Sequence, residues 1–128
     1  MSLKDQLRIM VVDDMSTSRA LIEQAMDEIG FSHVVYQNDP DQAFRRLTMQ
    51  PVHLVISDYH MPGLSGLQLL AALRGHQNTR AIGFILVSGR LDQTILAEGQ
   101  KYGLNNFIAK PFTTPSMRDC IEKVVGRL

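Results

Sequence analysis

The sequence predicts an α/β fold in which helices cover both faces of an open parallel sheet, giving three layers. Short apolar runs alternate with helical patterns five times along the chain. The apolar runs are continuous, which indicates strands that are buried on both faces. Strand–helix–strand units cross over with a single hand and so build a parallel sheet. Five strands suit the open, doubly wound order 2-1-3-4-5.

The first half of the chain supplies three of these strands and two helices. The strands are predicted from short runs rich in β-branched residues, at 8–12, 33–36 and 52–57. A helix is predicted over 16–29, because apolar side chains recur there at helical spacing and Gly30 can end it. The next helix should begin at Asp39 and Pro40, which suit the N-cap and the first helical position.

The second half repeats the pattern. The remaining strands are predicted at 83–88 and 107–109. A leucine stripe marks a helix over 66–74, and another is predicted over 92–102 although Gly99 inside it costs about 1 kcal/mol relative to alanine. Pro115 opens a last helix whose apolar stripe includes Cys120.

Length and composition limit the classes of protein that fit. The chain has 128 residues, 45% of them hydrophobic and 20% charged, with 13 basic and 13 acidic residues. These values suit one globular domain over 1–128 with no output domain, and zero net charge gives no support for nucleic-acid binding. Cys120 is the single cysteine, and no apolar run is long enough to span a bilayer. We therefore expect a cytoplasmic monomer that does not insert into membranes.

Polar side chains stand at the ends of four of the five predicted strands. They are Asp13 and Asp14 after the first strand, Asp58 after the third, Ser88 at the end of the fourth, and Lys110 after the fifth. With the order 2-1-3-4-5 these four strands are neighbours, and their carboxyl ends meet at one edge of the sheet. Ligands of open α/β sheets bind at that edge.

Three carboxylates in one pocket repel one another, and a hard divalent cation among them makes the arrangement tolerable. Mg²⁺ takes oxygen ligands and commonly bridges carboxylates to a phosphate. We predict that Asp13, Asp14 and Asp58, with a backbone carbonyl near His60, hold Mg²⁺, with Mn²⁺ as the alternative cation.

The same pocket contains the groups that phosphoryl transfer requires. A carboxylate can act as a nucleophile and form an acyl phosphate. We predict that Asp58 attacks phosphorus, that Lys110 pairs with one phosphoryl oxygen, and that Ser88 donates a hydrogen bond to another.

Four motifs in this order resemble the receiver domain of bacterial two-component response regulators, a CheY-like, flavodoxin-like fold. They are "VVDD" at 11–14, "LVISDYHMPGLSG" at 54–66, "ILVSG" at 85–89 and "FIAKPF" at 107–112. The resemblance spans essentially the whole chain. It implies the same site roles for the residues above, and a cis peptide between Lys110 and Pro111.

The resemblance also implies a switch. In the family, phosphorylation draws the hydroxyl residue, here Ser88, toward the phosphoryl group, and an aromatic residue, here Phe107, turns inward. The face formed by the fourth helix, fifth strand and fifth helix is thereby repacked for partner binding. Core packing alone is the other interpretation of Phe107. His60 and Arg90 occupy positions that tune dephosphorylation in the family; they either shield attacking water or are solvated side chains.

The family implies a phosphoacceptor that catalyses only its own phosphorylation and dephosphorylation and is not otherwise an enzyme. Its phosphoryl group would come from a sensor histidine kinase or a histidine-phosphotransfer protein. The stretch "VVDDMSTSR" at 11–19 resembles the chemotaxis branch, whose target is a flagellar motor switch protein. Gln93, Phe107 and Cys120 depart from the lysine, tyrosine and lysine of the enteric motor-binding version. A phosphorelay intermediate or a phosphate sink is therefore the alternative.

Two other classes fit less well. A haloacid-dehalogenase-like phosphatase also uses an aspartate nucleophile, a lysine and Mg²⁺, but it places a second acid where His60 stands here. A flavin-binding protein needs a phosphate-cradling loop after the first strand, where Asp13 and Asp14 would repel the phosphate.

Overall fold

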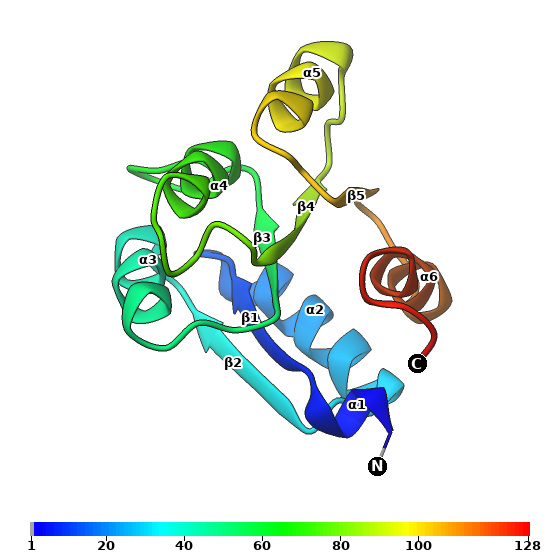
Figure 1. Ribbon diagram of the computed structural model, residues 1–128. Coiled ribbons are helices and arrows are strands. Elements are labelled where there is room, and N and C mark those ends of the chain that lie inside the picture. Colours follow the sequence, from blue (N-terminus) through cyan, green and yellow to red (C-terminus); the bar gives the residue numbers. More distant parts are fainter. Residues whose placement is uncertain (1) are drawn as a thin grey trace.

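The structure, a computed structural model, describes residues 2–128 and contains a five-stranded parallel sheet in the order β2-β1-β3-β4-β5 (Figure 1). The strands are β1 Arg8–Val12, β2 His33–Gln37, β3 Leu54–Asp58, β4 Gly83–Ser88 and β5 Asn106–Ala109. The predicted doubly wound order is confirmed.

The helices follow the strands as predicted, with one addition at the N-terminus. They are α1 Leu3–Gln6, α2 Ser16–Ile29, α3 Pro40–Met49, α4 Gly66–Arg74, α5 Gln93–Lys101 and α6 Thr114–Val125. The sequence did not predict α1, because four residues are too few to show a helical period. A hydrogen bond of 2.9 Å from the Ser32 hydroxyl to Asp5 holds α1 against the start of β2. The expected fourth and fifth helices are thus α5 and α6.

Two hydrophobic cores lie on the two faces of the sheet and give the three predicted layers. On one face α2 and α6 pack against alternate residues of β1, β3 and β4, and α3, α4 and α5 pack against the other face (Figure 1). Every residue of β3 is buried, because β3 is the central strand and both of its faces are covered. This strand ends at Asp58, so a rigid and fully packed element carries that carboxylate.

Local signals set most of the helix ends. The side chain of Asp39 accepts a hydrogen bond of 2.9 Å from the backbone N–H of Asp41, so the predicted N-cap of α3 is confirmed. Gly30 ends α2 with a φ of 98°, which a residue with a side chain rarely adopts. Asp92 lies just outside α5 as its N-cap and accepts from the N–H of Ile95 at 2.9 Å.

Several elements differ by one or two residues from their predicted bounds, and Gly99 has a role that the sequence analysis did not give it. The third strand begins at Leu54, two residues later than predicted, and includes Asp58, which pairs in register with Val87 of β4. Gly99 does not simply weaken α5: a Cβ there would lie 2.7 Å from Cδ2 of Leu104, so glycine allows the two to pack closely.

Within residues 2–128 no helix is long and apolar enough to cross a membrane.

Candidate functional site

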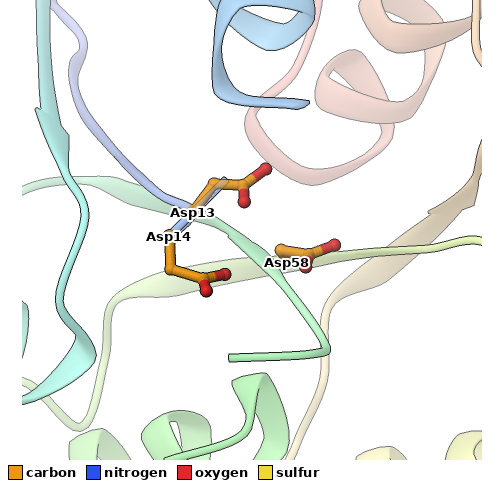
Figure 2. Close-up of side chains that lie close together, drawn as sticks. All are labelled: Asp13, Asp14 and Asp58. Carbon is orange, nitrogen blue, oxygen red and sulfur yellow. The ribbon is translucent and has the colours of Figure 1, made fainter. Parts of the chain in front are cut away.

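Three carboxylates meet where β1 and β3 end. Asp13 and Asp14 directly follow β1, Asp58 is the last residue of β3, and the two strands are paired neighbours. One oxygen from each carboxylate lies within 4.8 Å of the others. Figure 2 shows the three carboxyl groups extending to the same side of the strand ends. Asp13 is fully buried and Asp58 is 3% exposed, so water screens this cluster poorly.

The unpaired oxygens of this cluster fit a divalent cation. Oδ2 of Asp13 and Oδ1 of Asp14 are buried and accept no hydrogen bond. A buried carboxylate oxygen with no partner carries a large desolvation cost, which a cation offsets. The donors are all carboxylate oxygens, the type that hard cations such as Mg²⁺ prefer. Asp13, Asp14 and Asp58 are therefore able to hold such an ion, and the participation of the His60 carbonyl stays a prediction.

Lys110, the residue after β5, adds a positive charge beside Asp58. Its Nζ lies 2.7 Å from Oδ1 of Asp58. The backbone N–H of Lys110 donates to the carbonyl of Ser88 at 2.9 Å, so the residue after β5 is fixed to the end of β4. The peptide bond between Lys110 and Pro111 is cis, as the resemblance implied. The structure thus brings Lys110 together with the three aspartates.

The environment of Asp58 disfavours its charged form. Burial raises the pKa of the Asp58 carboxyl above its ordinary value of 3.8. The hydrogen bond and charge of Lys110 lower this pKa in part, and the neighbouring charge of Asp13 raises it further. The single positive charge of Lys110 therefore does not balance the negative charge of the three carboxylates.

Two residues that the sequence analysis did not identify hold the backbone at Asp58. A Cβ on Gly66 would lie 2.5 Å from the Asp58 carbonyl oxygen, so only glycine fits there. The hydroxyl of Ser57 donates to that same oxygen at 2.9 Å. The following peptide is fixed as well, because the N–H of Tyr59 donates to Val87 and its carbonyl accepts from Gly66, both at 2.9 Å. The signals for Gly66 were its place at the first position of a predicted helix and at the end of the motif over 54–66.

Ser88 lies at the neighbouring strand end, but its hydroxyl is already engaged. It is buried, donates to the Arg90 carbonyl at 2.9 Å and accepts from the Arg90 N–H at 3.0 Å. The Arg90 side chain is 82% exposed, with Nε 3.8 Å from Asp92. His60 is exposed, and its ring meets that of Tyr59 edge to face with centroids 4.8 Å apart. The side chains of His60 and Arg90 therefore both lie at the solvent-facing rim.

Comparison with known proteins shows the family. The model of the response regulator receiver domain matches residues 9–122. The chain belongs to this family. It is 38% identical over 128 residues, all of the chain and 99% of the relative, to a probable chemotaxis protein CheY of Rhizobium etli. It is 28% identical to the chemotaxis protein CheY of Pseudomonas aeruginosa, over 95% of the chain and 98% of that protein.

Solved receiver structures share the fold. The chemotaxis protein CheY4 of Vibrio cholerae gives a TM-score of 0.85 at 19% identity, covering 92% of this chain and 98% of that one. The receiver domain of a sensor histidine kinase from Pseudomonas aeruginosa, with a magnesium ion coordinated in its active site cleft, gives 0.84 at 23% identity, covering 94% and 98%. These structures share the fold, and the receiver-domain match with the 38% identical relative makes the chain a CheY-type receiver, a signalling domain of two-component systems.

Phe107 of this receiver points outward. It is 43% exposed on the edge strand β5, so core packing does not account for it in this structure. The thiol of Cys120 in α6 donates to the Phe107 carbonyl at 3.5 Å and ties the strand to the helix. Burial raises the pKa of that thiol to about 11, which keeps it protonated and unreactive at neutral pH.

Gly66→Ala should disturb the site through the backbone. The new methyl group would overlap the Asp58 carbonyl, and we expect a loss of about 1–3 kcal/mol in the free energy of unfolding. Urea denaturation measures this loss. Gly75→Ala is the matched control, because a Cβ there has ordinary contacts of 3.6 Å or more. Equal stability of the two variants would contradict the close approach at Gly66.

The raised pKa of Asp58 predicts that, in the absence of divalent cations, the free energy of unfolding decreases as pH rises. Between the unfolded value, near 3.8, and the higher folded value, the native state binds the extra proton. The free energy of unfolding therefore decreases as pH rises through this window, and Asp58→Asn lacks that decrease. Urea denaturation in EDTA from pH 4 to pH 8 should show that the free energy of unfolding of the variant increases relative to that of the wild type as pH rises. A constant difference between the two would contradict the assignment.

Proposed function

We propose that Asp58 accepts a phosphoryl group from the phosphohistidine of a sensor histidine kinase or a histidine-phosphotransfer protein. The observation that carries this proposal is the carboxylate of Asp58 at the end of the central strand, 2.7 Å from Lys110 and beside two carboxylates with unpaired oxygens. An Asp58 oxygen forms the new bond to phosphorus while the bond from phosphorus to the histidine nitrogen breaks. The released imidazole takes a proton from solvent.

The residues around Asp58 have distinct tasks in this reaction. The hydrogen bonds from Ser57 to the Asp58 carbonyl and from Gly66 to the Tyr59 carbonyl hold the backbone that carries the nucleophile. Lys110, already against one Asp58 oxygen, pairs with a phosphoryl oxygen. Bound at Asp13, Asp14, Asp58 and the His60 carbonyl, Mg²⁺ or Mn²⁺ supplies the positive charge that this crowding of anions requires. The magnesium ion in the kinase receiver from Pseudomonas aeruginosa supports this assignment.

Phosphorylation would then act on the face formed by α5, β5 and α6. The hydroxyl of Ser88 turns from the Arg90 carbonyl to a phosphoryl oxygen, and Phe107 turns inward from its exposed position. His60 and Arg90 at the rim shield the acyl phosphate from water and set its lifetime. We propose these roles from the positions of the four residues.

Chemotaxis is the proposed setting, with a flagellar motor switch protein as target. The names of the relatives in Rhizobium etli and Pseudomonas aeruginosa support it. Gln93, Phe107 and the buried Cys120 stand where the enteric motor-binding version carries lysine, tyrosine and lysine, which favours a phosphorelay intermediate or phosphate sink as the second candidate.

A groove beside the site suits the phosphodonor. It has a volume of about 650 Å³ and runs between α2 and residues 110–114. Leu21, 60% exposed, lies on its α2 side, and Lys110 forms its end nearest to Asp58. A protein that brings its phosphohistidine to Asp58 covers this apolar surface, whereas a small phosphodonor does not need it.

Asp58→Asn should abolish labelling by acetyl phosphate, because the amide is not a nucleophile. The wild-type label should depend on Mg²⁺, disappear in EDTA and be lost in mild base as an acyl phosphate is. Mass spectrometry and radiolabelling measure it, and Asp119→Asn, at an exposed position on α6, should label normally. A label that persists in Asp58→Asn would place the phosphoacceptor elsewhere.

Leu21→Lys should slow phosphorylation by a protein donor while leaving acetyl phosphate labelling unchanged. A lysine in the groove opposes apolar contact, and we expect the protein-donor rate to fall about fivefold or more. The donor is a phosphorylated histidine-phosphotransfer protein that phosphorylates the wild-type chain. Met49→Lys is the matched control, since Met49 is 82% exposed at the end of α3 and outside the groove. Equal loss with both donors would show damage to the site itself.

A further inference from the structure

Arg19, in the first turns of α2, contacts the acidic cluster through the backbone and not through a carboxylate. Its Nη1 donates a hydrogen bond of 2.8 Å to the backbone carbonyl of Asp13. The side chain is partly buried, so this contact is partly shielded from water. A hydrogen bond from a charged donor is stronger than one between neutral groups.

The contact completes a clamp around Asp13. The N–H of Asp13 donates to the Gln37 carbonyl at 3.0 Å, and its Oδ1 accepts from the N–H of Met15 at 3.0 Å. The backbone N–H of Arg19 donates to the Met15 carbonyl at 2.9 Å. Thus the N–H, the carbonyl and one carboxylate oxygen of Asp13 are all fixed. What stays free is Oδ2 of Asp13, together with Oδ1 of Asp14, and both are buried.

The choice of the carbonyl as acceptor has a chemical consequence. A guanidinium normally pairs with carboxylates, often with two parallel hydrogen bonds. Had Arg19 done so, it would have occupied the oxygens that a cation needs. Across residues 2–128 the ion pairs within 4.0 Å include none between Arg19 and an aspartate of the cluster. Arg19 therefore fixes the turn after β1 and leaves the ligand oxygens open.

We propose that Arg19 is a positioning residue of the metal site, which holds the Asp13 carbonyl and thereby orients the carboxylates of Asp13 and Asp14 before the cation binds. The inference rests on the cation site of the proposed function. Its physical basis is that groups behind metal ligands fix ligand orientation, and that ordering ligands in advance lowers the cost of binding.

Two effects of removing Arg19 have opposite signs, which makes the proposal testable. Loss of a nearby positive charge alone would tighten the binding of Mg²⁺. Loss of the hydrogen bond to Asp13 would weaken it, since the turn would have to be ordered on binding. The direction of the change therefore distinguishes a positioning role from an electrostatic one.

The test compares three variants of the full chain by isothermal titration with Mg²⁺. Arg19→Met removes both charge and donor, and we expect its Kd to rise about tenfold or more. Arg19→Lys keeps the charge and a donor but ends one atom short, and we expect a rise of about threefold. Arg118→Met, which removes a surface arginine from α6 and changes the net charge equally, should bind as the wild type does.

The free energy of unfolding, measured in EDTA, separates binding from folding. If Arg19→Met does not fold, the rise in Kd of Arg19→Lys decides the question. Wild-type affinity in both Arg19 variants, or tighter binding in Arg19→Met, would overturn the positioning role while the cation site stands. A wild-type chain that does not bind Mg²⁺ would overturn both this inference and the cation site.

Discussion

The site depends on the ion pair that stabilises the buried carboxylate of Asp58 at the end of the central strand. Asp58 is 3% exposed, and the ammonium group of Lys110 lies 2.7 Å from it. Because β4 lies between β3 and β5, Lys110 after β5 reaches across the end of β4 to form this ion pair. Yet Lys110 pairs with only one of the three carboxylates, and burial keeps the pKa of Asp58 raised. The remaining negative charge makes a divalent cation the fitting occupant of this pocket, and under the proposed function that cation would offset the charge of the phosphoryl group.

Rigid elements hold the groups of this site in place. β3 is buried along its whole length between two cores, so Asp58 has little freedom of its own. The hydroxyl of Ser57 binds its carbonyl, the N–H of Gly66 binds the next carbonyl, that of Tyr59, and Arg19 binds the carbonyl of Asp13. In each case the contact is to the backbone, which leaves the carboxylate oxygens available. Placement of reactive groups on packed strands with backbone support is the arrangement that gives an ordered site.

The sequence predicted the fold and the acidic cluster because both depend on patterns visible along the chain. Five alternating strand and helix patterns predicted the sheet order, and that order brought Asp13, Asp58 and Lys110 to one edge. What it missed has a common physical cause. Gly66 and Arg19 act on main-chain carbonyls, and such contacts leave no pairing of side-chain types to recognise. Likewise, the four residues of α1 are too few for a periodic signal.

The hydroxyl of Ser88 links the pocket to the output face under the proposed function. It has one proton, which it donates to the Arg90 carbonyl. To donate to a phosphoryl oxygen it must therefore break its hydrogen bond to that carbonyl. The released turn leads within two residues to Asp92, whose side chain caps α5 at Ile95. A change of hydrogen-bond partner at the strand end thus reaches the first turn of α5, the helix that precedes Phe107's strand in the chain. The distance to be bridged is short because the switch hydroxyl, the turn and the helix cap are consecutive in the chain.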